Sequence, residues 1–190
     1  METRTEVAPR ITLSKANLAS AAVCGNADSR PILSGLAVDH TGTTATDGHA
    51  LVHIAHQGIE PANTEMPVMI LDPQTVKALK GASPTVSSDG NGGVNAASMN
   101  GIAHYPLGVI EGTYPDWASV VPTEEPVIVL GLDLALLHRT LHALSAPTRN
   151  GAQVKATISI YGVKRPVKIE TTAGEGQEAM AIVMPMNLKA

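Results

Sequence analysis

Three stretches of this sequence of 190 residues follow one plan, in which a short helix is followed by strands that are joined by turns. Helices are expected at Leu13–Val23, at Pro73–Gly81 after the N-cap Asp72, and directly after the N-cap Asp133. A plan that recurs at this spacing indicates duplication. The sequence therefore predicts an α+β protein built from repeated strand–helix–strand units.

The expected strands are short runs in which apolar residues alternate or cluster. Runs around Ser34–His40 and Ala50–Ala55 follow the first helix, with Thr41-Gly42 as the turn between them. In the third helix an apolar stripe is expected; it consists of Leu134, Leu137, Leu141 and Leu144. The remaining strands are expected at Met66–Leu71, Val94–Met99, Ile102–Leu107, Val127–Leu130, Gln153–Tyr161, Pro166–Thr172 and Glu178–Met184.

The segment Pro122–Pro126 (PTEEP) is the best candidate for a linker, because prolines and acidic residues interrupt the apolar pattern there. We therefore expect a boundary between residues 1–122 and residues 123–190.

The composition indicates a globular protein of a reducing compartment. Hydrophobic residues make up 44% of the chain and charged residues 16%. The single cysteine, Cys24, excludes an internal disulfide framework. The polar N-terminus lacks an apolar signal region and no long apolar run follows, so we expect a cytoplasmic protein without a membrane segment.

The three predicted helices carry positive charge, and no acidic residue lies inside them. The net charge of the chain is −4, and removing the four Lys and Arg charges of the helices leaves about −8 for the rest. Basic helices on an otherwise acidic protein are consistent with a phosphate-binding surface. Charge alone favours the simpler interpretation, in which four charges on three helices are ordinary solvated faces. The residues concerned are Lys15, Lys77, Lys80 and Arg139, together with His138 and His142.

The stretch ATDGHALVHI gathers Thr, Asp, Gly and His directly before a strand. His49 and His53 would share one face of that strand, but His56 would point to the other, which disfavours a metal site. A nucleophile and its base at adjacent strand positions would also point apart. A turn is physically simpler, because Asp47 can form an Asx-turn and Gly48 can take a positive φ. We therefore expect no catalytic residue, no metal ligand and no cofactor.

A second unusual stretch, Met184-Pro185-Met186, lies near the C-terminus. It suits either a strand end with flexible core residues or an adaptable apolar pocket for a peptide.

Four stretches, in the family's order, resemble the bacterial sliding clamp, which is the beta subunit of DNA polymerase III. RPILSGLAVD (Arg30–Asp39) and ATDGHALV (Ala45–Val52) resemble a strand pair of the family's middle domain. YPDWASVVP (Tyr114–Pro122) resembles the stretch that closes that domain, and AIVMPMNL (Ala181–Leu188) resembles the C-terminal tail. By this resemblance, residues 1–122 correspond to the middle domain and residues 123–190 to the C-terminal part of the last domain.

The resemblance implies a closed ring in which helices, on one face of antiparallel sheets, surround duplex DNA. It implies a homo-oligomer that binds double-stranded DNA without sequence preference through the cations named above. DNA polymerase and other proteins with a clamp-binding motif are implied partners, and a clamp loader is a further candidate. ATDGHAL and MPM would form opposite walls of the groove that takes their peptides. The implied groove residues are Leu33, Thr46, Gly48, His49, Leu51, Pro122, Ile182, Met184, Pro185 and Met186.

The chain also departs from the family's pattern. Family members carry three domains of two units each, whereas three units are present here, so four copies would be needed for a ring of twelve units. Basic residues that are usual in the groove are replaced by Ala50 and Asn187.

Two other function classes remain open. The chain could be a clamp-derived adaptor or inhibitor that binds clamp-binding peptides without encircling DNA. A zinc-dependent or hydrolytic enzyme built on the histidines is the third hypothesis. The mass of the native assembly separates the first two, because an adaptor is expected to be a monomer.

Overall fold

The computed structural model describes residues 10–56, 67–79, 84–88, 94–97, 104–145, 154–172 and 176–187. The chain divides into two compact units, Met1–Pro122 and Thr123–Ala190. Within the described ranges, no helix has both the length and the apolar character that a membrane span requires.

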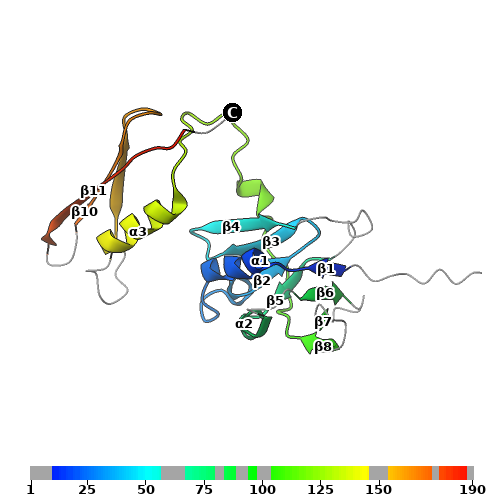
Figure 1. The fold of residues 1–190 in the computed structure, drawn as a ribbon. Helices are drawn as coiled ribbons and strands as arrows, with labels where there is room; N and C mark the ends of the chain where they lie inside the picture. Colours follow the sequence, from blue (N-terminus) through cyan, green and yellow to red (C-terminus); the bar gives the residue numbers. More distant parts are fainter. Residues whose placement is uncertain are drawn as a thin grey trace, which may run out of the picture. The chain divides into compact units, whose positions relative to one another are not determined.

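The first unit contains two four-stranded antiparallel sheets, ordered β4-β3-β2-β5 and β1-β6-β7-β8 (Figure 1). In the part of this unit that the structure describes, two α-helices and three short 3-10 helices accompany the strands. In chain order the elements are β1 (Arg10–Thr12), α1 (Lys15–Ala19), η1 (Ser20–Val23), η2 (Pro31–Ser34), β2 (Leu36–Val38), β3 (Gly42–Thr46), β4 (Leu51–Ala55), β5 (Met69–Leu71), α2 (Pro73–Leu79), β6 (Thr85–Ser88), β7 (Val94–Ala97), β8 (His104–Leu107) and η4 (Ala118–Val120).

The two halves of this unit exchange their first strands. β1, which precedes α1, pairs with β6 of the second half, with Ile11 opposite Val86. β5, which precedes α2, pairs with β2 of the first half, with Leu71 opposite Leu36. Figure 1 shows β1 beside β6 rather than beside β2. Each half therefore completes the sheet of the other.

One hydrophobic core serves both halves. Leu18 from α1 and Val76 and Leu79 from α2 belong to the same buried cluster as the core residues of the exchanged strands. The helix that begins at Lys15 is fixed by Ser14, which forms a capping box with Asn17. Since both helices bury residues in one cluster, the halves are energetically a single domain.

The second unit is one further repeat of the same plan. It consists of α3 (Leu134–Ser145), β9 (Ala156–Ile160), β10 (Val167–Thr172) and β11 (Glu178–Val183), with the antiparallel sheet order β11-β10-β9. Its core is smaller than that of the first unit. Val167, Ile169 and Val183 are buried beneath partly buried leucines.

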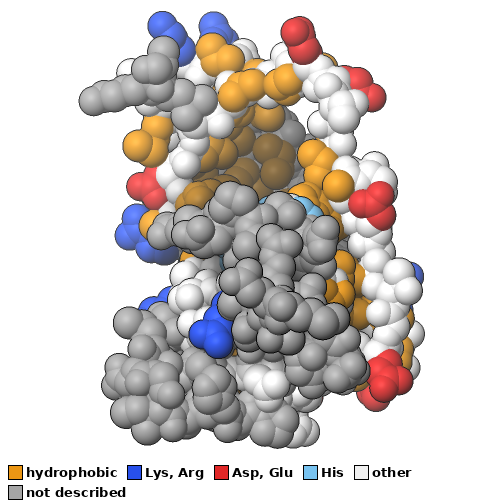
Figure 2. All heavy atoms as spheres, turned by 90° about the vertical axis from the view of Figure 1, so that its right-hand side faces the viewer, with side chains coloured by type: hydrophobic (Ala, Val, Ile, Leu, Met, Phe, Trp, Pro, Cys, Tyr) orange, Lys and Arg blue, Asp and Glu red, His pale blue; other side chains and the backbone are white. Residues whose placement is uncertain are grey.

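Several expectations about the second unit were wrong in detail. Val127–Leu130 does not form a strand, and only an isolated bridge, from Gly131 to Met186, precedes α3. The apolar stripe of α3 is only partly buried. Leu137 and Leu144 pack on the core, but Leu134 is 78% exposed and Leu141 40% exposed. Figure 2 shows hydrophobic side chains gathered on the surface in the upper part of that view.

In the first unit the expected strands and helices are present, and several bounds differ within the described residues. The expected ends at Met66, Gly81, Met99 and Ile102 lie outside the described residues. The first helix is an α-helix that continues as the 3-10 helix η1. The sequence interpretation missed β3, whose residues Gly42–Thr46 lie between β2 and β4 and include part of the expected turn. Buried Thr43 and Thr44 in this central strand have side-chain hydrogen bonds, Thr43 to Asn17 and Thr44 to His53.

Candidate functional site

The Thr-Asp-Gly-His cluster forms the turn between β3 and β4. One carboxylate oxygen of Asp47 accepts hydrogen bonds from the backbone N–H groups of His49 (2.7 Å) and Ala50 (2.8 Å). The Thr46 hydroxyl accepts from the N–H of Gly48 (3.0 Å) and donates to the carbonyl of Ala50 (2.6 Å). Gly48 has a φ of +89°. The turn interpretation is therefore confirmed.

These hydrogen bonds explain why the pKa of the Asp47 carboxyl group is lowered. The backbone N–H groups of Ala50 and His49 hold the pKa of Asp47 below its ordinary value. Asp47 stays ionised at neutral pH and is engaged by the backbone. Its carboxylate therefore holds the turn in shape.

The turn is one wall of a cavity of about 420 Å³ in the first unit. Side chains from η2, from the β3–β4 hairpin and from the segment that ends the unit surround this cavity, and most of its surface is apolar. The lining residues are Arg30, Leu33, Thr46, Gly48, His49, Ala50, Leu51, Tyr114, Pro115, Asp116, Trp117 and Val120.

The segment Tyr114–Val120 is attached to the hairpin by two aromatic contacts. The buried Tyr114 hydroxyl donates a hydrogen bond to the carbonyl of Thr44 (3.4 Å). Burial raises the pKa of Tyr114 to about 12, so the phenol remains a donor. The ring of Trp117 stacks on that of His53, with centroids 4.1 Å apart and planes inclined by 18°. These contacts keep the second wall of the cavity opposite the turn.

The charges at the cavity are Arg30 and Asp116, which are both exposed. The Arg30 guanidinium lies so close to Gly48 that a Cβ at this glycine would collide with it. His53 and His56 are engaged elsewhere, with Thr44 (2.9 Å) and with the carbonyl of Asp39 (3.0 Å). Within the described ranges, no three His, Cys, Asp or Glu side chains are placed to hold a metal ion. The site is therefore suited to holding an apolar side chain.

Half of the groove residues implied by the resemblance lie together at this cavity: Leu33, Thr46, Gly48, His49 and Leu51. Pro122 is exposed and does not line it. The sequence reasoning missed Arg30, Tyr114 and Trp117, among others. A signal for them existed, because they belong to the stretches RPILSGLAVD and YPDWASVVP.

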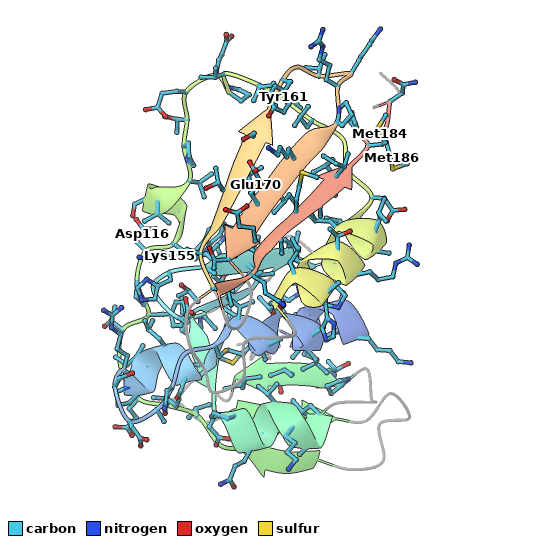
Figure 3. The ribbon with its side chains drawn as sticks, turned by 90° about the vertical axis from the view of Figure 1, so that its left-hand side faces the viewer. Asp116, Lys155, Tyr161, Glu170, Met184 and Met186 are labelled. Carbon is cyan, nitrogen blue, oxygen red and sulfur yellow. The ribbon has the colours of Figure 1, made fainter. Side chains whose placement is uncertain are left out.

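The other four implied groove residues belong to the second unit, and the two units are described separately. Ile182 lies in β11, while Met184 and Met186 follow it (Figure 3). These three side chains are more than half exposed, and Pro185 is partly buried. Met186 is held by a hydrogen bond from its N–H to the carbonyl of Gly131 (2.8 Å). The convergence of these residues with Leu51 stays a prediction.

The cations expected to face DNA are exposed wherever they are described. Lys15 is the first residue of α1 and Lys77 lies in the last turn of α2. Arg139, His138 and His142 are exposed on α3. Lys80 lies outside the described residues.

Comparison with known proteins identifies the fold. No protein-family model matches the sequence, and no curated protein sequence matches it either. Among solved structures, the DNA polymerase sliding clamp of Bacillus subtilis matches with a TM-score of 0.71 and 16% identity. This match covers 97% of the present chain and 50% of the clamp.

Two further structures agree with this match. The beta sliding clamp of Caulobacter crescentus has a TM-score of 0.70 and 19% identity, over 97% of this chain and 52% of the clamp. The beta subunit of the DNA polymerase of Streptococcus pyogenes has a TM-score of 0.63 and 20% identity, over 98% and 52%. The present chain spans about half the length of these clamps. The chain has the α+β fold of the bacterial sliding clamps.

Proposed function

We propose that this chain is a sliding-clamp-like processivity factor, which encircles duplex DNA as a homo-oligomer and tethers replication or repair proteins to it. The observation that carries the proposal is the apolar cavity beside the Thr46–Leu51 turn, on a chain with the clamp fold. A clamp needs such a docking site, because it acts by holding other proteins on DNA.

The tethering site is a peptide groove with two walls. Leu33, Leu51 and Trp117 supply apolar surface around the cavity in the first unit. In this proposal the second unit supplies Met184 and Met186, which have adaptable side chains and are exposed. An anchor residue such as Leu or Phe near the end of a partner peptide enters between them. Since Ala50 and Asn187 carry no charge, affinity depends on the apolar anchors.

Retention on DNA is topological in this proposal. A closed ring stays on DNA without tight contacts, and exposed helix cations such as Lys15, Lys77 and Arg139 meet phosphates without reading sequence. No bond is made or broken, so the protein needs neither a catalytic residue nor a cofactor. DNA polymerase is a partner in the cytoplasm, and a clamp loader is a candidate for opening the ring.

A peptide titration tests the tethering site. A peptide that ends in a clamp-binding motif with Leu or Phe should bind with a dissociation constant of roughly micromolar size. Leu51→Ala or Met184→Ala should each weaken binding by more than about tenfold, because losing a pocket anchor commonly costs ~2 kcal/mol. Val163→Ala, at an exposed position outside the groove, is the control and should bind like the unmodified chain. Unchanged affinity in both groove variants would reject the groove.

The position of the cavity favours one second candidate, because all its lining residues belong to the first unit. In this alternative the chain is an adaptor or inhibitor that occupies clamp-binding peptides without encircling DNA. An adaptor passes the peptide titration but is not retained on circular DNA.

A further inference from the structure

The second unit contains the parts of a strand exchange that it does not complete. In the first unit, the segment before each helix pairs with the first strand after the other helix, as β1 does with β6 and β5 with β2. The second unit has the corresponding segment, Leu130–Leu132, and the corresponding strand, β9. Within its described part, β9 is an edge strand of the sheet β11-β10-β9.

The segment before α3 is already placed as β5 is placed before α2. Leu71 of β5 forms a bridge with Val109, beyond the last strand of its own half, while its other side pairs with β2. Gly131 likewise bridges Met186, beyond β11. By this correspondence, the other side of the segment around Gly131 is positioned for a strand from another repeat.

Burial along β9 indicates that half of a core is missing. Ile158 and Ile160 lie directly opposite Ile169 and Val167, so they are on the face of the sheet that α3 covers. Yet Ile158 is 59% exposed and Ile160 43% exposed, whereas Val86 of the corresponding strand β6 is fully buried. Figure 3 shows β9 at one side of the sheet, between Lys155 and Tyr161.

The helix shows the same deficit. In the first unit α1 and α2 contribute to one core cluster, so each half covers part of the other. In the second unit α3 has a wider apolar arc than its own sheet buries, and Leu134 and Leu141 remain exposed. An exposed edge with uncovered apolar neighbours is a site for strand pairing with another chain.

We propose that the second units of two copies of this chain complete each other. The Leu130–Leu132 segment of one copy pairs antiparallel with β9 of its partner, and the partner returns the same pairing. This is the exchange seen between the halves of the first unit, with a true twofold axis. Such a contact is self-complementary and closes on two chains. It covers Ile158 and Ile160, which have no such cover in a single second unit.

Charge supports a second copy as the occupant. When the segment before α3 pairs antiparallel with β9 of the partner, the residues that precede this segment lie beside the partner's β9–β10 turn. That upstream chain contains Glu124 and Glu125, and the turn contains Lys164 and Arg165, all of them exposed. Opposite charges therefore meet twice across the axis, which favours this register.

This pairing rests on the proposed function, because it identifies a surface through which the chain forms the proposed homo-oligomer. The pairing itself requires neither DNA nor a peptide. Two paired chains contain six repeats, and two such pairs would contain the twelve that a ring of clamp type needs. An assembly that survives Ile158→Lys would contradict this pairing but would leave a homo-oligomeric ring intact, so failure of the pairing is distinguishable from failure of the proposed function.

The test is the mass of the full chain in solution, measured by sedimentation equilibrium. The unmodified chain should form dimers or an even multiple of them. Ile158→Lys should raise the dissociation constant of the dimer by at least about tenfold, with an unchanged circular dichroism spectrum because this side chain is exposed in one copy. Met180→Lys, at an exposed position on the opposite face of the same sheet, is the control and should leave the mass unchanged.

A charge exchange tests the register. Glu124→Lys with Glu125→Lys, or Lys164→Glu with Arg165→Glu, should each weaken the dimer severalfold, and all four changes together should restore it. A monomeric unmodified chain would overturn the proposal. So would an assembly that Ile158→Lys leaves intact, because another surface would then hold the copies together. If the variant with all four charge changes does not dimerise as tightly as the unmodified chain, the pairing register is contradicted.

Discussion

At the scale of single residues, Gly48 links the shape of the turn to the shape of the cavity. It has a positive φ, and its missing side chain leaves room for the Arg30 guanidinium. Alanine at this position should cost about 1–2 kcal/mol of stability, because an L residue is disfavoured in this conformation. It should also displace Arg30 and weaken peptide binding.

A matched control separates these two effects. Gly176 has a φ of +77°, and a Cβ there meets nothing within 4 Å. Gly176→Ala should therefore lower the stability of its unit without changing peptide affinity. Thermal unfolding and a peptide titration on both variants check this expectation. If Gly48→Ala binds peptide as tightly as Gly176→Ala, the cavity is not the binding site.

The residues of the turn could be predicted because the information is local. An Asp followed by Gly and an apolar alternation specifies an Asx-turn within a few residues. Tyr114 and Trp117 could not be placed in the same way, because their partners Thr44 and His53 lie far away in sequence. Only the family resemblance singled out the stretch that contains them, and it did not assign these two residues to the groove.

At the scale of elements, the segment Tyr114–Val120 acts as a wall that Trp117 attaches to β4. Trp117→Ala removes the stack on His53 and opens the cavity. Aromatic stacking contributes about 0.5–1.5 kcal/mol beyond the burial of area. We therefore expect peptide affinity to fall about tenfold, while the secondary structure stays intact.

Trp117→Phe is the conservative counterpart. Its ring can still stack on His53, so most of the affinity should return in the same titration. An alanine variant that binds peptide normally would show that the segment is not part of the site.

The strands and helices were predictable to different degrees. β3 was missed because its sequence, GTTAT, reads as a turn followed by polar residues, although tertiary hydrogen bonds satisfy its buried threonines. The Val127–Leu130 run was expected to be a strand because its residues favour strands. A strand also needs a neighbour, and the described part of the second unit provides only the Gly131 bridge.

At the scale of the whole molecule, the repeated plan was the strongest sequence signal, and the structure has the corresponding fold. The exchange of β1 and β5 between halves could not be predicted, because nothing local states which sheet a short strand joins. The way in which copies of the chain assemble could not be predicted from the sequence either. It depends on edges and faces, such as those of β9, that become visible only in the folded units.

Retention on circular DNA is the most direct test of encirclement. The protein is allowed to assemble in the presence of a closed circular duplex, half of the sample is then linearised, and both halves are passed over a sizing column. A closed ring should travel with the circular DNA and be released when the DNA is cut. The fourfold variant Lys15→Glu, Lys77→Glu, Lys80→Glu and Arg139→Glu should be retained less, with a flatter salt dependence. Equal retention on circular and linear DNA, or none on either, would contradict encirclement.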